Sequence, residues 1–441
     1  MKIRLPPAHF LAAGGGLALG AVLTYGTAAG LQKETSFTHF MLRTDFPAFI
    51  TGARLLAAGQ GASLYDTQAQ MPVQAQLLAP DAYPGGLLPY DHLPFLAAAL
   101  APLAGLPLPV SYAAWLGATA LVLLLALLLL AGEVRSLART PTERRWAPVA
   151  LFALSLGFVP LFQSLLQAQT APWDLLSYTL MLRYLRRERP VAAGLALCLV
   201  LLKPQLLLVP LCLLLYESRW KTLAAFAGVG SGLCLLITPL LGGPGWVVAY
   251  LKLLGSVAAV DPTASPIKPG LMENLRGFFT LLLSRLAPAS SGWVVPLTLA
   301  ASLGVLALVV VAWRGRRSVS WSADPAGWDA RWAVALIATL LINPHGMPYE
   351  LTLLILPGVL LWRAAREADL PGLAGRTGAL IAGGYIACTV TTALVNGTAW
   401  PFHTAVLFLM LALPLLCIPR WWATGSADLR PAPTAPLTAE C

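Results

Sequence analysis

Long apolar runs alternate with short polar segments along almost the whole chain, and this pattern predicts a bundle of membrane-spanning helices. A helix crosses the hydrocarbon core of a bilayer with about 20 apolar residues, and several runs reach or approach that length. The predicted fold class is therefore an all-α polytopic membrane protein with about 12 transmembrane helices. The predicted spans are 8–29, 108–131, 148–165, 171–184, 191–202, 205–216, 222–241, 293–313, 332–343, 349–363, 377–395 and 402–419.

Two stretches interrupt this regular pattern. The apolar piece 92–106 is short and flanked by prolines, so two interpretations stay open: a re-entrant segment, or a helix paired with the following span. The spans 191–202 and 205–216 meet at Lys203 and Pro204. Because proline cannot donate a backbone hydrogen bond, this junction predicts a broken helical hairpin.

The composition agrees with a membrane protein. Hydrophobic residues make up 58% of the 441 residues and charged residues 11%, whereas soluble domains carry about 25% charged residues. The formal net charge of +10 does not indicate nucleic-acid binding, because the basic residues cluster in short loops between spans. Five of the six cysteines lie inside apolar runs without metal-ligand spacing. We therefore expect no disulfide framework, no metal and no other cofactor.

The distribution of Lys and Arg predicts how the protein is oriented in the cell membrane, which is expected to be the inner membrane. Basic loops follow the positive-inside rule when they lie in the cytoplasm together with the N-terminus. The run after Lys2 and Arg4 is expected to be an uncleaved first span, because no cleavage site clearly ends it. The basic loops lie in 132–147, 183–189, 219–221, 314–331 and 363–376.

This orientation places two long loops, 30–91 and 242–292, outside the cytoplasm. In the first, "DFPAFITGARLLAAG" and "YDTQAQMPVQAQLLA" each predict a short amphipathic helix at the membrane surface. Residues 1–423 are expected to form a single transmembrane domain, and the Pro/Ala/Thr-rich residues 424–441 a disordered cytoplasmic tail.

Polar residues without a role in topology gather on the predicted outer side. Burying an ionisable group within the membrane costs free energy, so such groups usually face a cavity or a site. The gathering of these residues on one side therefore indicates an extracytoplasmic active cavity. The candidate residues are Asp45, Asp91, His92, Gln169, Lys203, Gln205, Lys268, Asn274, Arg276, His345 and Tyr349, with Glu350, Asn396 and His403 nearby.

Each of these residues also has a purely structural interpretation, which the residue pattern leaves open. Asp45 stands where it would cap the helix that begins at "FP". Lys203 has a side chain long enough to reach the membrane surface. Asn274 and Arg276 stand where they would cap a re-entering helix. Glu350 and Asp91 stand where each would pair with another charge at the interface.

Several stretches together resemble glycosyltransferase family 87, also called the DUF2029 family, over roughly residues 1–365. They are "DFPAFITGARLLAAGQGASLYD", "YPGGLLPYDHLPFLAAALAPLAGLPLPVSYAAW" and "LRRERPVAAGLALCLVLLKPQLLLVPLCLLL". The resemblance implies a GT-C type fold, a sugar donor of the polyprenyl-phosphate type, and mannose as the sugar. It implies Asp45 as the catalytic acidic residue of the first external loop and places a functional histidine at His345. "QAQTAP" departs from the usual "GQ" pair of the family, which leaves the role of Gln169 open.

The expected reaction is an inverting transfer from a lipid-borne sugar phosphate to a lipid or glycan acceptor. Asp45 would act as the general base, because the hydroxyl of the acceptor must lose its proton. Lys203 is the first candidate to bind the departing phosphate, followed by Arg276, Lys268 and His345. A metal-independent reaction is expected, because no DxD-like motif stands out.

Two other functions suit parts of the same pattern. A secondary transporter or flippase for a lipid-linked or amphiphilic solute would also have a broken helix and buried polar groups. Such a protein would place its essential charges near the bilayer midplane, whereas these residues gather on one side. A lipid-linked sugar ligase or polymerase would share the topology.

Overall fold

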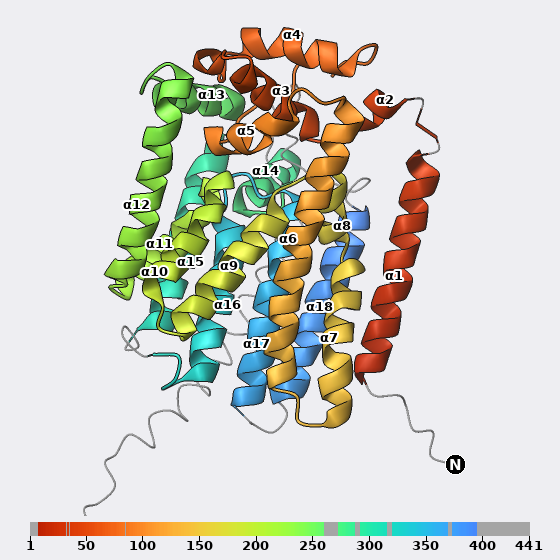
Figure 1. Cartoon of the computed structure of the whole chain (residues 1–441). Helices are drawn as coiled ribbons and strands as arrows, with labels where there is room; N and C mark the ends of the chain where they lie inside the picture. The colour runs from red at the N-terminus through yellow and green to blue at the C-terminus, as the bar shows by residue number, and fades with distance from the viewer. Residues whose placement is uncertain are drawn as a thin grey trace, which may run out of the picture.

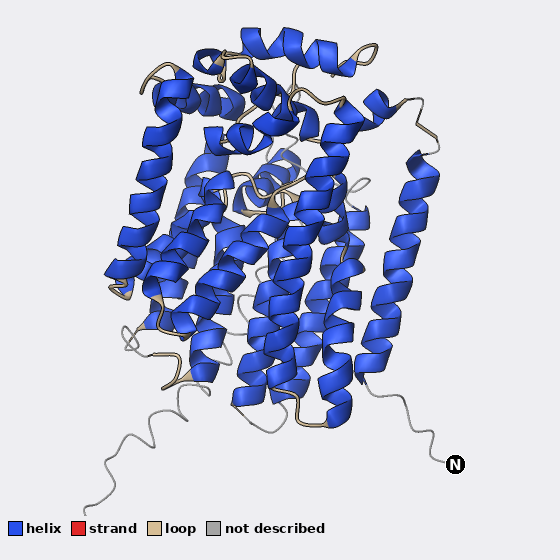
Figure 2. Ribbon diagram, in the orientation of Figure 1, coloured by secondary structure: helices blue, strands red, loops and turns tan. Residues whose placement is uncertain are grey.

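The computed structural model describes residues 8–31, 33–34, 36–83, 85–259, 272–286, 292–314, 320–368 and 373–394. Within these residues the protein is helical, and they contain no strand (Figure 2). Most long helices run side by side, and a layer of shorter helices covers one end of the bundle (Figure 1). Lys268, Asn396, His403, the predicted span 402–419 and the predicted tail lie outside the described residues.

The α-helices are α1 (Ala8–Leu31), α2 (Phe37–Met41), α3 (Phe46–Ala57), α4 (Thr67–Leu78), α5 (Pro94–Leu100), α6 (Leu108–Ser136), α7 (Pro141–Leu156), α8 (Val159–Leu166), α9 (Ala171–Arg186), α10 (Pro190–Leu197), α11 (Leu208–Tyr216), α12 (Trp220–Ile237), α13 (Trp246–Ala259), α14 (Leu275–Leu286), α15 (Val294–Trp313), α16 (Pro325–Ile342), α17 (Ile355–Glu367) and α18 (Leu373–Leu394). Short 3₁₀ helices are η1 (Gly61–Ser63), η2 (Ala101–Leu103), η3 (Cys198–Leu202), η4 (Pro204–Leu207), η5 (Thr238–Leu241) and η8 (Pro348–Leu354).

Three helices among the described residues are long and apolar enough to cross a membrane: α6, α12 together with η5, and α15. Their outward faces carry large aliphatic side chains; Leu235 and Leu236 of α12 are each 75% exposed. In a soluble protein such faces would be driven out of water, so they fit contact with lipid. The chain is therefore a membrane protein, and the number of twelve spans stays a prediction.

The predicted span 148–165 is not one straight helix. α7 and α8 meet at a bend of 58°. Gly157 caps the end of α7, and Pro160 stands in the first turn of α8. Pro160 has no N–H to donate to the preceding turn, so one backbone hydrogen bond is missing at this point, and the helix is interrupted here next to Gly157.

α16 begins at Pro325, seven residues before the predicted start of its span at 332. Asp324 caps the helix by accepting a hydrogen bond of 3.0 Å from the backbone N–H of Gly327. Every residue from 327 to 341 is buried, so α16 is a central helix of the bundle. The prediction began too late because Asp329 and Arg331 resemble loop residues, whereas both are buried and paired inside the protein.

The covering layer consists of α2 to α5 and α13 (Figure 1). Helices form at both predicted places in the first long loop, but α3 is not a surface helix: Phe46 to Ala53 are all buried. In α4 the two buried side chains Gln70 and Gln74 bind backbone groups of the segment 64–90. The polar positions that predicted an amphipathic surface helix thus serve to hold the first loop together.

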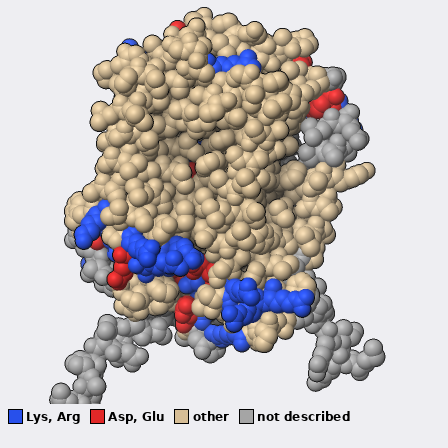
Figure 3. Space-filling view, viewed as in Figure 1, with Lys and Arg blue, Asp and Glu red and all other residues tan. Residues whose placement is uncertain are grey.

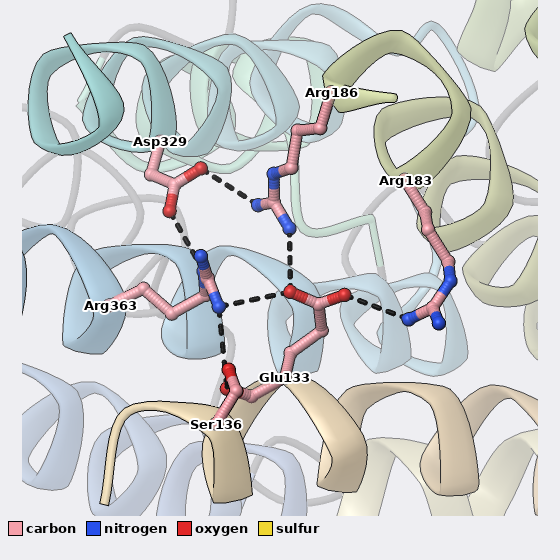
Figure 4. Close-up of polar contacts among 6 residues, drawn as sticks. All are labelled: Glu133, Ser136, Arg183, Arg186, Asp329 and Arg363. Carbon is pink, nitrogen blue, oxygen red and sulfur yellow. Dashed lines mark hydrogen bonds and ion pairs between the residues drawn. The ribbon is translucent and has the colours of Figure 1, made fainter. Parts of the chain in front are cut away.

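Lys and Arg side chains gather mainly at the end of the molecule opposite this layer (Figure 3). There, Glu133 accepts hydrogen bonds from Arg183 and Arg186, at 2.9 and 3.0 Å. Asp329 pairs with Arg186 and Arg363, at 2.7 and 2.9 Å (Figure 4). This ion-pair network joins α6, α9, α16 and α17, so these arginines hold helices together in addition to biasing topology.

Candidate active site

The helix break at Lys203 brings a buried positive charge into the bundle. η3 ends and η4 begins at this residue, which is only 3% exposed. Its ammonium group forms an ion pair of 3.0 Å with Glu350 and lies 4.5 Å from the ring centroid of Tyr349. Lys203 therefore lies within a polar cluster and does not extend toward a membrane surface.

Asp45 lies at the start of α3, but its side chain makes no capping hydrogen bond. Instead, its Oδ2 accepts hydrogen bonds from the side-chain amide of Gln169 and, at 3.3 Å, from the hydroxyl of Tyr349. Asp45 stays partly exposed. The carboxylate thus belongs to a tertiary site, and the capping interpretation does not account for it.

The backbone next to Asp45 is anchored by Tyr83. The hydroxyl of Tyr83 lies 2.8 Å from the carbonyl oxygen of Thr44 and 3.2 Å from that of Met41, and it donates to these acceptors. Tyr83 comes from the far end of the same loop, after α4. The first loop therefore folds back on itself to hold the residue before Asp45 in place.

Burial raises the pKa of the Asp45 carboxyl above its ordinary value, although the positive charges of Lys203 and His92 act in the opposite direction. Burial has this effect because it disfavours the charged form. A raised pKa makes the carboxylate a stronger base than an aspartate in water. Asp45 is thereby suited to accept a proton.

A second loop closes the cluster from the other side. Asn343, at the end of α16, donates a side-chain hydrogen bond to Glu350, and its carbonyl oxygen accepts one of 2.7 Å from Asn274. The side-chain oxygen of Asn274 also accepts a hydrogen bond of 2.7 Å from the N–H of Gly277 in α14. Asn274 therefore caps α14, as one of its two sequence interpretations predicted. It also connects α14 to the loop at 343–347.

His345 lies in this loop and is partly buried. Burial lowers the pKa of its imidazole, the charge of Arg276 lowers it further, and Asp91 partly opposes this shift. The imidazole is therefore neutral near pH 7. A neutral imidazole can donate one hydrogen bond and accept another.

Asp91 and His92 lie between the covering layer and this loop. Oδ1 of Asp91 lies 3.0 Å from Nδ1 of His92. Burial raises the pKa of Asp91, but opposing interactions, of which those with His92 are the largest, outweigh burial and leave the pKa lowered. The ring of His92 also packs edge-on against Phe49 of α3, with centroids 4.8 Å apart. Asp91 therefore pairs locally, as one of its two interpretations expected.

Several buried polar atoms without a hydrogen-bond partner among the described residues belong to residues 164–174, around the start of α9, and to residues 345–352, which include part of η8. η8 packs against α8 and α9. Buried polar groups are normally hydrogen-bonded, so such a group of atoms is typical of a binding site. They are Ser164 Oγ, Gln169 Oε1, Thr170 Oγ1, both carboxylate oxygens of Asp174, His345 Nδ1 and Thr352 Oγ1.

Asp174 was not among the predicted site residues, and Glu350 was predicted only to lie near them. Asp174 is 1% exposed in the first turn of α9, where the charges of Lys203 and Glu350 act on it. The sequence carried one signal for Asp174, because it is a carboxylate inside the predicted span 171–184. Gln205 lies in η4 next to Lys203 and is partly exposed.

The model of glycosyltransferase family 87 matches residues 92–344, which is more than half of the chain. The chain therefore belongs to glycosyltransferase family 87, and it is a membrane glycosyltransferase. No curated protein and no solved structure matches it. The matched segment includes Gln169, Lys203 and Asn274, begins after Asp45, and ends directly before His345.

Proposed function

We propose that this protein is an inverting glycosyltransferase that moves a sugar, with mannose as the family expectation, from a polyprenyl-phosphate donor to a lipid or glycan acceptor. The observation that carries the proposal is the environment of Asp45. The residue is partly exposed, and its carboxyl group has a raised pKa and is oriented by Gln169 and Tyr349 from two distant parts of the chain. Such an oriented carboxylate is suited to act as a general base.

In the proposed step, Asp45 takes the proton of an acceptor hydroxyl as its oxygen attacks the anomeric carbon of the sugar. The bond between that carbon and the phosphate oxygen breaks, and the polyprenyl phosphate leaves with the bonding electron pair. A positioned general base typically contributes a factor of about 10²–10⁴ to the rate. Direct displacement with one base inverts the configuration, because no covalent glycosyl-enzyme forms.

The ion pair between Lys203 and Glu350 changes the roles that we propose for the cations. The charge of Lys203 is already balanced at 3.0 Å inside the protein. We therefore propose Lys203 as a positioning residue for Tyr349. We propose that His345 and Arg276, whose charge acts on His345, bind the departing phosphate. His345 would donate a hydrogen bond as a neutral imidazole.

The buried polar atoms at the start of α9 are proposed to bind the hydroxyl groups of the sugar. Oε1 of Gln169, Oγ1 of Thr170 and the carboxylate of Asp174 are hydrogen-bond acceptors without a partner among the described residues. Sugar hydroxyls supply the donors that such acceptors need. Asp174 is the strongest acceptor of the three because it can carry a negative charge.

The site lies toward the end opposite the basic loops, which supports a location on the extracytoplasmic side. Nucleotide sugars are made in the cytoplasm and do not reach that side unaided. A lipid-linked sugar phosphate is therefore the proposed donor.

The test uses purified full-length protein, a membrane lipid extract as acceptor, and radiolabelled polyprenyl-phosphate-mannose or, in parallel, nucleotide-linked mannose. We expect glycolipid product from the polyprenyl donor alone, and a loss of about 100-fold or more in Asp45→Asn. Asp66→Asn is the matched control, because Asp66 is exposed and only caps α4. Equal product from wild type and Asp45→Asn would remove Asp45 as the base, and product from the nucleotide sugar alone would remove the proposed donor.

A further inference from the structure

A hollow of about 430 Å³ lies between the end of α6 and the beginning of α7. Pro141, Arg144, Arg145 and Pro148 of α7 line it from one side, and Arg135 of α6 from the other. The four positions of α7 follow the spacing i, i+3, i+4 and i+7, so they form one face of its first two turns. The hollow is thus a built groove with three guanidinium groups.

The charges of this region are separated between its two sides. Its two glutamates face the bundle: Glu133 binds Arg183, Arg186 and Arg363, and Glu143 pairs with Arg366 at 2.6 Å. Among the described residues no carboxylate lines the groove, and the structure describes no ion pair for its three arginines. The positive-inside rule requires basic residues in this loop, but it does not require them to face one groove while every glutamate faces away.

The groove lies at the level where the apolar run of α6 ends. The apolar run of α6 ends just before Glu133, and Arg135 follows within one turn. On α7, the guanidinium of Arg145 lies 5.4 Å from the ring centroid of Trp146, a residue type enriched at membrane interfaces. The N-terminus of α7, a helix of 16 residues, adds the positive end of its dipole. All of these features favour an anion at headgroup depth.

We propose that this groove binds the headgroup of an anionic phospholipid, with the phosphate held by Arg135, Arg144 and Arg145. Guanidinium groups bind phosphate oxygens in pairs of parallel hydrogen bonds, which gives such a site geometric selectivity. The acyl chains of the lipid would lie against the apolar outer surfaces of α6 and α7, where Leu128 and Val149 are exposed. The groove is at the opposite end of the bundle from Asp45, so the proposal does not depend on the glycosyltransferase mechanism.

Native mass spectrometry of the full-length protein, titrated with phosphatidylglycerol or phosphatidylcholine, tests this proposal. The variant Arg144→Gln/Arg145→Gln removes two charges from the groove. The matched control Arg187→Gln/Arg189→Gln removes two exposed charges from the turn between α9 and α10. Each basic residue near an anionic membrane surface contributes a factor of about five, so we expect the first variant to weaken phosphatidylglycerol binding about 10- to 30-fold.

We expect the control variant to change that affinity by less than about threefold, and phosphatidylcholine to bind equally weakly to all three proteins. Equal losses of phosphatidylglycerol affinity in the two variants would mean that the lipid is attracted by the overall positive charge. This result would overturn the proposed site. Equal binding of the two lipids to the wild type would overturn the selectivity for anions. Displacement of the lipid by glycerol phosphate at comparable concentration would assign the groove to a soluble phosphate instead.

Discussion

The hydroxyl of Tyr349 lies 3.3 Å from Oδ2 of Asp45, a residue 304 positions earlier in the chain. The same tyrosine ring lies under the ammonium group of Lys203. One side chain therefore connects the carboxylate of the first loop to the buried cation of the broken hairpin. This connection links the proposed chemistry at Asp45 to the electrostatics of the bundle.

Replacing Tyr349 with phenylalanine removes the hydrogen bond to Asp45 and keeps the ring beside Lys203. A hydrogen bond of this kind contributes about 0.5–1.5 kcal/mol, so we expect sugar transfer to fall roughly 2- to 10-fold. Tyr385→Phe is the matched control, because the hydroxyl of Tyr385 donates a hydrogen bond of 3.0 Å to the carbonyl oxygen of Leu154 in α7. Unchanged transfer in Tyr349→Phe would show that the hydroxyl does not orient the base.

The pH dependence of transfer should report the ionisation of Asp45. Only the carboxylate accepts a proton, so the rate falls as the pH falls through the pKa of Asp45. Because burial raises this pKa, the acid limb of kcat/KM should lie above the ordinary aspartate value of about 4. The hydrogen bond from Tyr349 lowers the pKa, so the limb should move to higher pH in Tyr349→Phe. A profile that is flat from about pH 4 to about pH 8 would contradict this assignment.

Substitutions of Lys203 and Glu350 should have coupled effects on the free energy of unfolding, because the two side chains form a buried ion pair. Removing either partner leaves a buried charge uncompensated, so Lys203→Met and Glu350→Gln should each lower the free energy of unfolding by about 3–5 kcal/mol. The double variant Lys203→Met/Glu350→Gln should lose less than the sum of the two single losses, because no charge is left unpaired. Thermal unfolding in detergent measures this coupling. Strictly additive losses would mean that the two groups do not interact.

The ion-pair network at the basic end should stabilise the bundle without taking part in sugar transfer. Asp329→Asn weakens the pairing of Arg186 and Arg363 in a fully buried place, so we expect a loss of about 3–5 kcal/mol in the free energy of unfolding. Arg183→Gln is the comparison, because its side chain is 26% exposed and partly exposed pairs contribute about 1 kcal/mol or less. Transfer at low temperature should persist in both variants, and its complete loss in folded Asp329→Asn would connect the network to the reaction.

The orientation of the protein can be tested by cysteine labelling in intact cells, in a background without the natural cysteines. We expect Gln68→Cys, on the exposed side of α4, to react with a membrane-impermeant maleimide added outside. Arg187→Cys, in the exposed turn after α9, should react only after the cells are opened. The reverse pattern would place the site in the cytoplasm and remove the argument for a lipid-linked donor.

Several local features could be predicted because each depends on a few neighbouring residues. The break at Lys203 follows from Pro204, and the helices α3 and α4 form where their patterns indicated. The bend between α7 and α8 and the early start of α16 were missed, because one follows from Gly157 and Pro160 inside an apolar run and the other from buried charges. A run of apolar residues does not reveal such interruptions unless each proline and charge is given its own weight.

The sequence alone determined that this chain is a helical membrane protein, because the average polarity of each segment decides whether it enters the membrane. It also predicted that the polar residues without a role in topology share one side. Only the tertiary structure decided which of these residues meet. It turned Asp45 from a helix cap toward Gln169 and Tyr349, paired Lys203 with Glu350, and brought Asp174 beside them. Contacts between residues more than a hundred positions apart arise from helix packing, and local patterns carry no information on that packing.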